Sequence, residues 1–339
     1  MTYTRSTINM IENNFENHTC FIKQSGCLLN SLDNSKLFFT NNTIYNMTNQ
    51  NGFSAFSFES SFMFVRYNDM NLISSYNLIE TCIFASSTQI LIQNSSFLNY
   101  QINAVYFIDC FVILSNLIFT ETQVFITDKK LISPIYAENC IYFFMNFTNI
   151  SLNTHSQIGG ACSVQSDSTK NIIILKNNVF FKNIASDQGG ALNIVTANLT
   201  LLDSIFIENF ALSSGGALLY DSLEPNNTFV YERNQFISNK AIEEGGAIKW
   251  GGVIPNSSEN IFINNTAIYG GDIAAYPMKI GLEINITSED GYCDVSSFDE
   301  NSLFYSNLAC VSSGNVGNFV LTIKILDIYS NIVNDLNGK

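Results

Sequence analysis

The feature that most constrains the fold of this chain is a motif that returns every 25 to 30 residues. A Phe is followed three residues later by an Asn, and a Gly-Gly pair follows the Asn after six residues, or after five in the last copy. The copies are Phe180, Asn183, Gly189, Gly190; Phe206, Asn209, Gly215, Gly216; Phe236, Asn239, Gly245, Gly246; and Phe262, Asn265, Gly270, Gly271. Repeats of this length are typical of solenoids, in which each unit buries its face against the next.

Short apolar runs stand on both sides of each copy. Residues 171–175 and 198–202 precede a Phe, residues 191–195 follow a Gly-Gly pair, and all three runs are rich in Ile, Leu or Val. Such runs, bounded by Asn, Asp, Ser and Gly, predict short strands, and no apolar period of a helix separates them. Two or three strands per repeat without a covering helix predict one coil of a parallel β-helix.

The repeated residues have predicted structural roles. The Phe column is expected to point inward and bury apolar area. The Asn column is expected at a turn, where Asn tolerates left-handed backbone angles and hydrogen-bonds to the Asn one coil away. The Gly-Gly pair supplies a sharp corner without Cβ atoms. These roles predict a scaffold, with no chemistry at the repeat residues.

The motif Phe-x-x-Asn-x-Ala, followed by Gly-Gly-Ala and Ile or Leu, resembles the repeat of chlamydial polymorphic outer-membrane proteins. It is also similar to repeats in large surface and transmembrane proteins of ciliates. The resemblance is specific over residues 147–276 and degenerate before them. It implies a right-handed β-helix of the pectin-lyase-like superfamily, a surface or secreted location and, for the bacterial relatives, adhesion. It implies no catalytic residue.

The chain is therefore predicted to be all-β with two parts. Residues 1–276 form a right-handed parallel β-helix of about ten coils, with degenerate coils over 1–146 and regular repeats over 147–276. Residues 277–339 alternate in longer strands and resemble the start of a truncated immunoglobulin-like β-sandwich. A long solenoid of this kind keeps one continuous core despite its length.

The net charge of the chain restricts the classes of partner that it can bind. The net charge of -14 at a pI of 4.4 argues against nucleic acid, which needs a basic face. The first ten residues lack the apolar core of a signal peptide, and no run of 18 apolar residues occurs. With the family resemblance, the chain is expected to be an extracellular or cell-surface piece of a longer protein. Membrane attachment would then come only from parts of that protein outside this sequence.

Sequons of the form Asn-x-Ser/Thr are frequent and agree weakly with secretion. The candidate glycosylation sites are Asn17, Asn41, Asn46, Asn94, Asn198, Asn226, Asn256 and Asn285.

The eight Cys residues are too few for a disulfide scaffold of this length. Cys110 and Cys140 each lie six residues before an anchoring Asn, so they are expected to stack on neighbouring coils. They either pair in an oxidising compartment or stay free as small buried residues. Further candidate pairs are Cys20 with Cys27 and Cys293 with Cys310. No spacing typical of a zinc site occurs.

Enzymes with this fold cleave acidic polysaccharides with clustered carboxylates and a nearby base. Here the acidic residues are scattered, and His18 and His155 are far apart in sequence. The nearest approach to a site is Asp203, Arg233 and Glu259, predicted at the same strand position, three residues before the Phe, on consecutive coils. An ion-pair ladder suits them equally well. We expect no catalytic, metal or cofactor site, and surface glycans or proteins as partners. A carbohydrate-active enzyme is the alternative.

Overall fold

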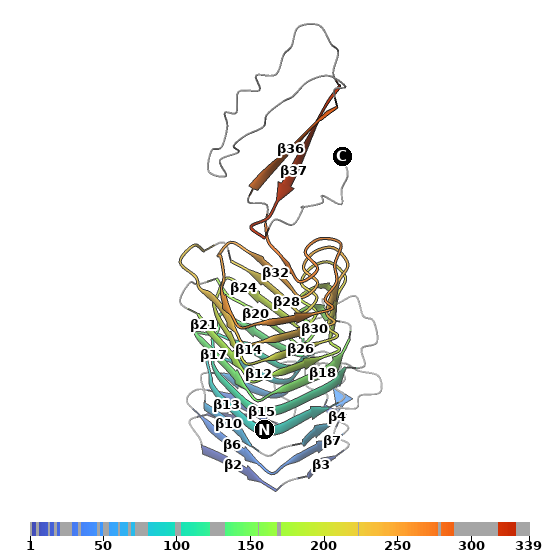
Figure 1. Cartoon of the computed structure of the whole chain (residues 1–339). Coiled ribbons are helices and arrows are strands. Elements are labelled where there is room, and N and C mark those ends of the chain that lie inside the picture. The colour runs from blue at the N-terminus through green and yellow to red at the C-terminus, as the bar shows by residue number, and fades with distance from the viewer. Residues whose placement is uncertain are drawn as a thin grey trace. The chain divides into compact units, whose positions relative to one another are not determined.

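The computed structural model describes residues 2–4, 7–12, 14–16, 19–20, 29–32, 35–45, 48–49, 54–59, 62–66, 69–71, 81–98, 103–122, 133–154, 156–167, 171–222, 224–276, 279–287 and 318–329. These residues form strands and turns and contain no helix. Over residues 2–276 the strands stack in parallel ladders, and the chain winds as a β-solenoid (Figure 1). Leu199, for example, pairs with Ile173 of the preceding coil and with Phe229 of the following one. The predicted all-β fold class and the parallel β-helix are confirmed.

Each coil contributes to two long sheets. Sheet 1 has 11 strands, one from each turn of the chain. They are β1 (Thr2–Thr4), β5 (Leu29–Leu32), β9 (Ser54–Glu59), β12 (Thr81–Ser86), β14 (Asn103–Ile108), β16 (Ile135–Glu138), β20 (Cys162–Gln165), β24 (Leu192–Val195), β28 (Leu218–Asp221), β32 (Ile248–Gly251) and β35 (Ile273–Ala274). Sheet 1 provides one wall of the core.

Sheet 2 has 18 strands, arranged as two tracks that meet at a bend. The first track holds β2 (Thr7–Ile11), β6 (Lys36–Thr40), β10 (Phe62–Arg66), β17 (Tyr142–Asn146), β21 (Ile172–Lys176), β25 (Asn198–Leu202), β29 (Phe229–Glu232) and β33 (Asn256–Ser258). The second holds β3 (Asn14–Glu16), β7 (Thr43–Tyr45), β11 (Asp69–Asn71), β18 (Asn149–Asn153), β22 (Val179–Phe181), β26 (Ile205–Ile207), β30 (Gln235–Ile237) and β34 (Ile261–Ile263). β13 (Gln89–Leu98) and β15 (Phe111–Thr122) run through both tracks.

Two smaller parallel sheets complete the coils. Sheet 3 consists of β19 (Ser156–Ile158), β23 (Ile184–Gln188), β27 (Phe210–Ala211) and β31 (Lys240–Ala241). It lies between the second track of sheet 2 and sheet 1 along the chain. Near the N-terminus, β4 (Thr19–Cys20) pairs with β8 (Thr48–Asn49).

The solenoid has about seven turns, fewer than the expected ten or so. Eleven strands stack in sheet 1, and seven of them, β12 to β32, are strands of four or more residues with described inward side chains.

The core is built from columns of identical or similar side chains. Phe180, Phe206 and Phe236 are fully buried, and their ring centroids stack 4.6 and 4.8 Å apart. Phe262 continues the column at 5.1 Å and is half-buried, because β34 is the last described strand of this track. The spacing equals the distance between paired strands, so ring stacking follows directly from the register of the coils.

The chain divides into two compact units, with the boundary between Tyr276 and Pro277. In the second unit, β36 (Lys279–Thr287) pairs antiparallel with β37 (Asn318–Leu326) over nine residues of each strand. The immunoglobulin-like sandwich stays a prediction, since these two strands are what the structure describes between residues 277 and 326.

Candidate functional site

The Asn residues of the repeat form a continuous ladder at the corner after the second track of sheet 2. The amide of Asn183 donates to Oδ1 of Asn209 at 3.0 Å, Asn209 donates to Asn239 at 2.9 Å, and Asn239 donates to Asn265 at 3.1 Å. Asn209 also donates to the carbonyl oxygen of Phe180 at 3.0 Å, and its Oδ1 accepts the backbone NH of Asn183. All polar side-chain atoms of Asn209 are thus paired in a buried corner, and the column is structural.

The ladder ends on the residue that breaks the repeat. Asp272 stands where the other copies have Ala, and its Oδ1 accepts a hydrogen bond from the amide of Asn265 at 3.0 Å. In the coils that come earlier in the sequence, the Asn of the following coil provides this acceptor. Asp272 therefore caps the Asn ladder at its last rung.

A second ladder, which sequence reasoning missed, runs along the bend of sheet 2. The backbone NH of Thr148 donates to Oδ1 of Asn178, and that of Asn178 donates to Oγ of Ser204. The NH of Ser204 donates to Asn234, and the NH of Asn234 donates to Asn260. Because Thr, Ser and Asn alternate in this column, identity at a fixed offset does not reveal it. The shared ability to accept a backbone hydrogen bond would have been the signal.

The Gly-Gly pairs form the corner that precedes sheet 1. Gly189 has φ of +64°, and the first Gly of the other three pairs is also in the left-handed region. A Cβ atom on Gly190 would overlap the carbonyl oxygen of Gly216 in the next coil. The first Gly is required by backbone angle and the second by the close approach of coils. Neither Gly is left free to contact a ligand.

The three residues nearest to a catalytic arrangement lie at the bend and adopt left-handed angles. Asp203, Arg233 and Glu259 have φ of 49°, 53° and 55°, so the strand position expected for them is wrong. Nε of Arg233 donates to Oδ1 of Asp203 at 2.7 Å, and Nη2 donates to Oδ2 at 3.2 Å. The hydrogen bond from Arg233 lowers the pKa of the Asp203 carboxyl group. Asp203 and Arg233 thus form an exposed ion pair, which Glu259 does not join.

A row of aromatic side chains lies on the outward face of sheet 1, one from each of three coils. Phe84, Tyr106 and Tyr136 are half-buried, whereas Val105 and Phe107, on either side of Tyr106, are fully buried. The ring centroids lie 5.5 Å apart for Phe84 and Tyr106 and 5.0 Å apart for Tyr106 and Tyr136, both edge to face. We call these three residues the aromatic strip.

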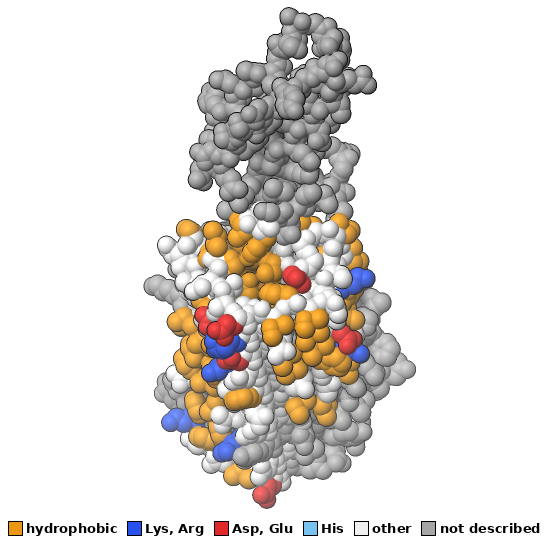
Figure 2. All heavy atoms as spheres, viewed as in Figure 1, with side chains coloured by type: hydrophobic (Ala, Val, Ile, Leu, Met, Phe, Trp, Pro, Cys, Tyr) orange, Lys and Arg blue, Asp and Glu red, His pale blue; other side chains and the backbone are white. Residues whose placement is uncertain are grey.

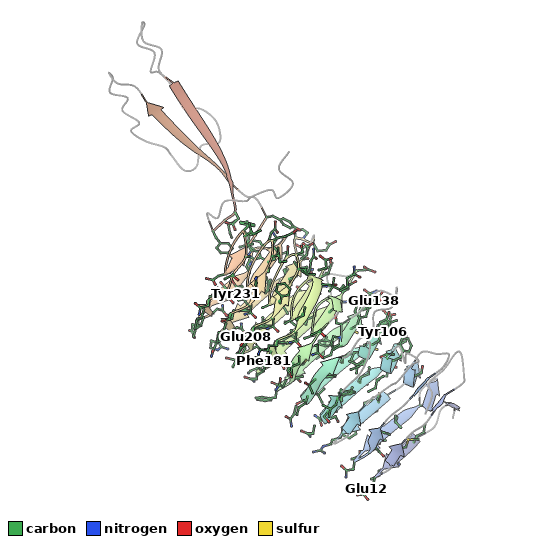
Figure 3. All side chains as sticks on the ribbon, turned by 90° about the vertical axis from the view of Figure 1, so that its right-hand side faces the viewer. Glu12, Tyr106, Glu138, Phe181, Glu208 and Tyr231 are labelled. Atoms are coloured by element: carbon green, nitrogen blue, oxygen red, sulfur yellow. The ribbon has the colours of Figure 1, made fainter. Side chains whose placement is uncertain are left out.

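Polar groups border the aromatic strip. The hydroxyl of Tyr106 donates to Oε2 of Glu138 at 3.2 Å, and the hydroxyl of Tyr136 donates to Oε1 of Gln165 at 3.3 Å. Figure 3 shows Tyr106 and Glu138 close together on one flank of the solenoid. Burial, and next the charge of Glu138, raises the pKa of both Tyr side chains, which keeps their hydroxyl groups protonated. Rings beside carboxylate and amide oxygens suit a ligand with apolar faces and hydroxyl groups.

Sequence reasoning did not find the aromatic strip. Its residues lie in the degenerate coils, where Phe84 and Tyr106 are 22 residues apart and Tyr106 and Tyr136 are 30 apart. Uneven spacing hides a column that the strand register makes regular, since Phe84 pairs with Tyr106 and Tyr106 with Tyr136. The available signal was an aromatic residue between two apolar residues in each run.

The outward face of sheet 2 has an apolar character. Figure 2 shows hydrophobic side chains gathered on this side of the solenoid, with few charged groups among them. Ile261 and Ile263 are 49% and 45% exposed, and Phe181, Ile207 and Ile237 are half-buried in the coils below. The ion pair between Lys182 and Glu208 borders this face. These side chains leave apolar surface exposed along the outward face of sheet 2.

The candidate glycosylation sites have different surroundings. Asn41, Asn226 and Asn256 are exposed, and Asn94 and Asn198 are half-buried. Oδ1 of Asn198 accepts from the NH and the hydroxyl of Thr228, so its amide is committed to the fold. Asn17 and Asn46 lie outside the described residues, and only the backbone of Asn285 is described.

The described residues contain neither a cluster of metal-ligand side chains nor a membrane-spanning helix. No group of three His, Cys, Asp or Glu side chains gathers in them closely enough to hold a metal ion. His18 and His155 lie outside them. Within the part of the chain that the structure describes, no helix is long and apolar enough to cross a membrane.

Comparison with known proteins returns no relative: no family model, no curated protein and no solved structure matches this chain. The class is therefore defined by the fold, a parallel β-solenoid.

Proposed function

We propose that this chain is a non-enzymatic segment of a large extracellular or cell-surface protein, where its β-helix is a rigid spacer that presents a recognition surface. The supporting observation is how the repeat residues are used. The Phe, Asn and Gly-Gly columns are all occupied by contacts between coils. What remains for a partner lies on the outward faces of the sheets.

The resemblance of the repeats supports the location. Phe-x-x-Asn and Gly-Gly-Ala repeats of this style occur in chlamydial polymorphic outer-membrane proteins and in large ciliate surface proteins. Membership of this chain in that group of β-helix proteins is part of the proposal. The test is immunolabelling of cells that express the protein. Antibody against residues 1–276 should label intact cells, and labelling that requires permeabilised cells would refute a surface location.

The recognition surface that we propose is the aromatic strip, with surface glycans as its ligands. Glycans combine apolar ring faces with hydroxyl groups, which match the rings of Tyr106 and Tyr136 and the oxygens of Glu138 and Gln165. Affinity electrophoresis in gels that contain neutral or acidic polysaccharides measures such binding. We expect retardation that is lost in Tyr106→Ala with Tyr136→Ala.

Tyr142→Ala is the matched control for that experiment. Tyr142 is also half-buried on an outward face, but it belongs to sheet 2, where its ring stacks on Phe111 at 4.7 Å. Retardation that is equally lost in this control, or absent from the wild type, would argue against glycan recognition by the aromatic strip. The spacer role would then stand alone.

The alternative function is a carbohydrate-active enzyme, and one pair of charged residues favours it. Asp203 and Arg233 lie on consecutive coils and touch, which brings a carboxylate beside a cationic group that could stabilise charge. Against an enzyme, the guanidinium group of Arg233 forms ion pairs with both Asp203 and Glu232, so Arg233 is not free to act as a base. We expect no turnover of polygalacturonate or alginate. Cleavage that disappears in Asp203→Asn would support the enzyme hypothesis and contradict the non-enzymatic one.

A further inference from the structure

Cys110 and Cys140 occupy the same corner of two neighbouring coils. The register of sheet 1 pairs Ile108 with Glu138, and the NH of Asp109 donates to the carbonyl oxygen of Glu138. Asp109 and Asn139 then share left-handed angles, so the next residues, Cys110 and Cys140, lie level. The expected stacking is present, although Asn146 lies level with Ser115 instead of Asn116 because Ile141 is an extra residue.

The two thiols lie in a closed environment at this shared corner. Cys110 and Cys140 are 0% and 1% exposed. The interaction between the two neighbouring thiols lowers the pKa of Cys110 and raises that of Cys140. Strands of adjacent coils are about 4.8 Å apart, and a disulfide joins Cα atoms about 4.4–6.8 Å apart. The stacked pair therefore meets the distance requirement without movement of the backbone.

Equivalent corners in other coils show which residue types satisfy the packing and hydrogen bonding at the position of Cys110. Thr88 fills the same corner one coil below, and its hydroxyl donates to the carbonyl oxygen of Ser86 at 2.8 Å. Ser95 and Ser204 make the same bond to the residue two positions earlier. Cys110 repeats it with Ile108 at 3.1 Å, although a thiol is the weaker donor. Packing and hydrogen bonding are met by Thr or Ser, so Cys on two successive coils calls for another reason.

We propose that Cys110 and Cys140 form a disulfide that joins two neighbouring coils when the chain folds in an oxidising compartment. The reaction is thiol–disulfide exchange with a small disulfide such as oxidised glutathione. One Cys thiolate attacks that disulfide, which gives a mixed disulfide and releases one glutathione. The other Cys thiolate attacks the mixed disulfide and releases the second glutathione, so the two glutathione thiols together carry the two electrons and two protons that the protein thiols lose. Because both thiols are buried in the folded coil, the exchange takes place before the coils close.

The test is a disulfide map of the full chain. Protein that is reduced, unfolded and then refolded with reduced and oxidised glutathione is unfolded again in an alkylating reagent, proteolysed without reduction and analysed by mass spectrometry. We expect one linked peptide pair that contains Cys110 and Cys140. Cys162 is the internal control: it is equally buried, its neighbours in register are Ile135 and Leu192, and it should be alkylated. Alkylated Cys110 and Cys140, or linkage of either to another Cys, would overturn the proposal.

A second measurement links the bond to the fold. The midpoint of thermal unfolding should be higher for the oxidised protein than for the protein kept in dithiothreitol, because the disulfide closes a loop in the unfolded chain. Cys110→Thr with Cys140→Thr copies the corner residue of the coil below and should abolish this difference. Equal midpoints of oxidised and reduced wild type would contradict the proposal. If the double variant fails to fold, the peptide map of the wild type still decides.

Discussion

At the scale of single residues, one side chain often makes hydrogen bonds to both neighbouring coils. Asn209 is the best example, because its amide donates to the coils on both sides and its oxygen accepts from the coil below. Removal of the Asn209 amide would leave unpaired polar groups in a buried corner, and a buried unpaired polar group lowers the stability of the fold.

Asn209→Ala should lower the free energy of unfolding by about 1–3 kcal/mol, since partners in both neighbouring coils lose their bonds. Urea unfolding followed by circular dichroism measures this change. Asn226→Ala, at an exposed Asn of a turn, is the control and should have little effect. Equal losses in the two variants would show that the ladder does not stabilise the fold.

The second Gly of each pair should tolerate no Cβ atom while another coil lies above it. Gly190→Ala should destabilise the protein several-fold more than Gly271→Ala, because a Cβ on Gly190 overlaps the backbone of the next coil. On Gly271 the nearest heavy atom, the carbonyl oxygen of Asn265, would lie 3.3 Å away. Thermal unfolding of the two variants measures the contrast. Similar unfolding midpoints would contradict close coil contact as the role of Gly190.

The ion pair at the bend predicts a small pH dependence. The folded-state pKa of Asp203 is lowered by Arg233, so the pair contributes stability above the ordinary pKa of Asp, about 3.9. That contribution is lost as the pH falls below this value and through the lowered pKa, because the protonated carboxyl no longer attracts Arg233. Unfolding midpoints of wild type and Asp203→Asn should therefore differ at pH 6 and converge in acid. A difference that persists or grows in acid would contradict this account.

At the scale of elements, the ends of each ladder need a different solution from its middle. The last rung of the Asn ladder has no Asn above it in the described coils, and the carboxylate of Asp272 accepts from Asn265 instead. Such a cap closes a strand edge with charge and limits further pairing there.

Asp272→Ala should loosen the last coil while the coils before it stay intact, because only Asn265 loses an acceptor. Amide hydrogen exchange measured by mass spectrometry should be faster over residues 256–276 and unchanged over 171–222. Asp272→Asn keeps an acceptor at the same place and should restore the wild-type pattern. Faster exchange throughout the solenoid, or none anywhere, would refute a local cap.

At the scale of the whole molecule, the solenoid unit is a stack in which each coil contacts only its neighbours. The corner residues Asp203 and Arg233 both have left-handed angles, and Ser204 and Asn234 both follow them in the second ladder. A cut at each of these points removes one full turn of the chain. Stability of a stack of this kind is close to a sum over coils and their interfaces.

Deletion of residues 204–233 should therefore leave a folded solenoid that is one coil shorter, with Asp203 joined to Asn234. Deletion of residues 206–231 removes four residues fewer, breaks the register of the strands that follow, and should impair folding. Circular dichroism and urea unfolding of both variants measure the outcome. An in-phase variant as disrupted as the out-of-phase one would mean that contacts beyond neighbouring coils maintain the fold.

The sequence determined the periodic part of this protein. Identical residues at a fixed offset must stack when strands pair in register, so the columns of Phe180, Asn183 and Gly189 could be predicted from spacing alone. The same reasoning placed a change of structure after Tyr276, where the period stops.

Only the tertiary structure decided the features that depend on register without identity. The ladder of Asn178 and Ser204 alternates residue types, and the aromatic strip of Tyr106 and Tyr136 lies in coils of uneven length. Asp203 and Arg233 were placed on strands because period alone does not distinguish a strand from the left-handed turn beside it. Spacing in sequence reports which residues are equivalent. Which side of the sheet they face depends on where the backbone turns, and the hydrogen bonds between coils set those turns.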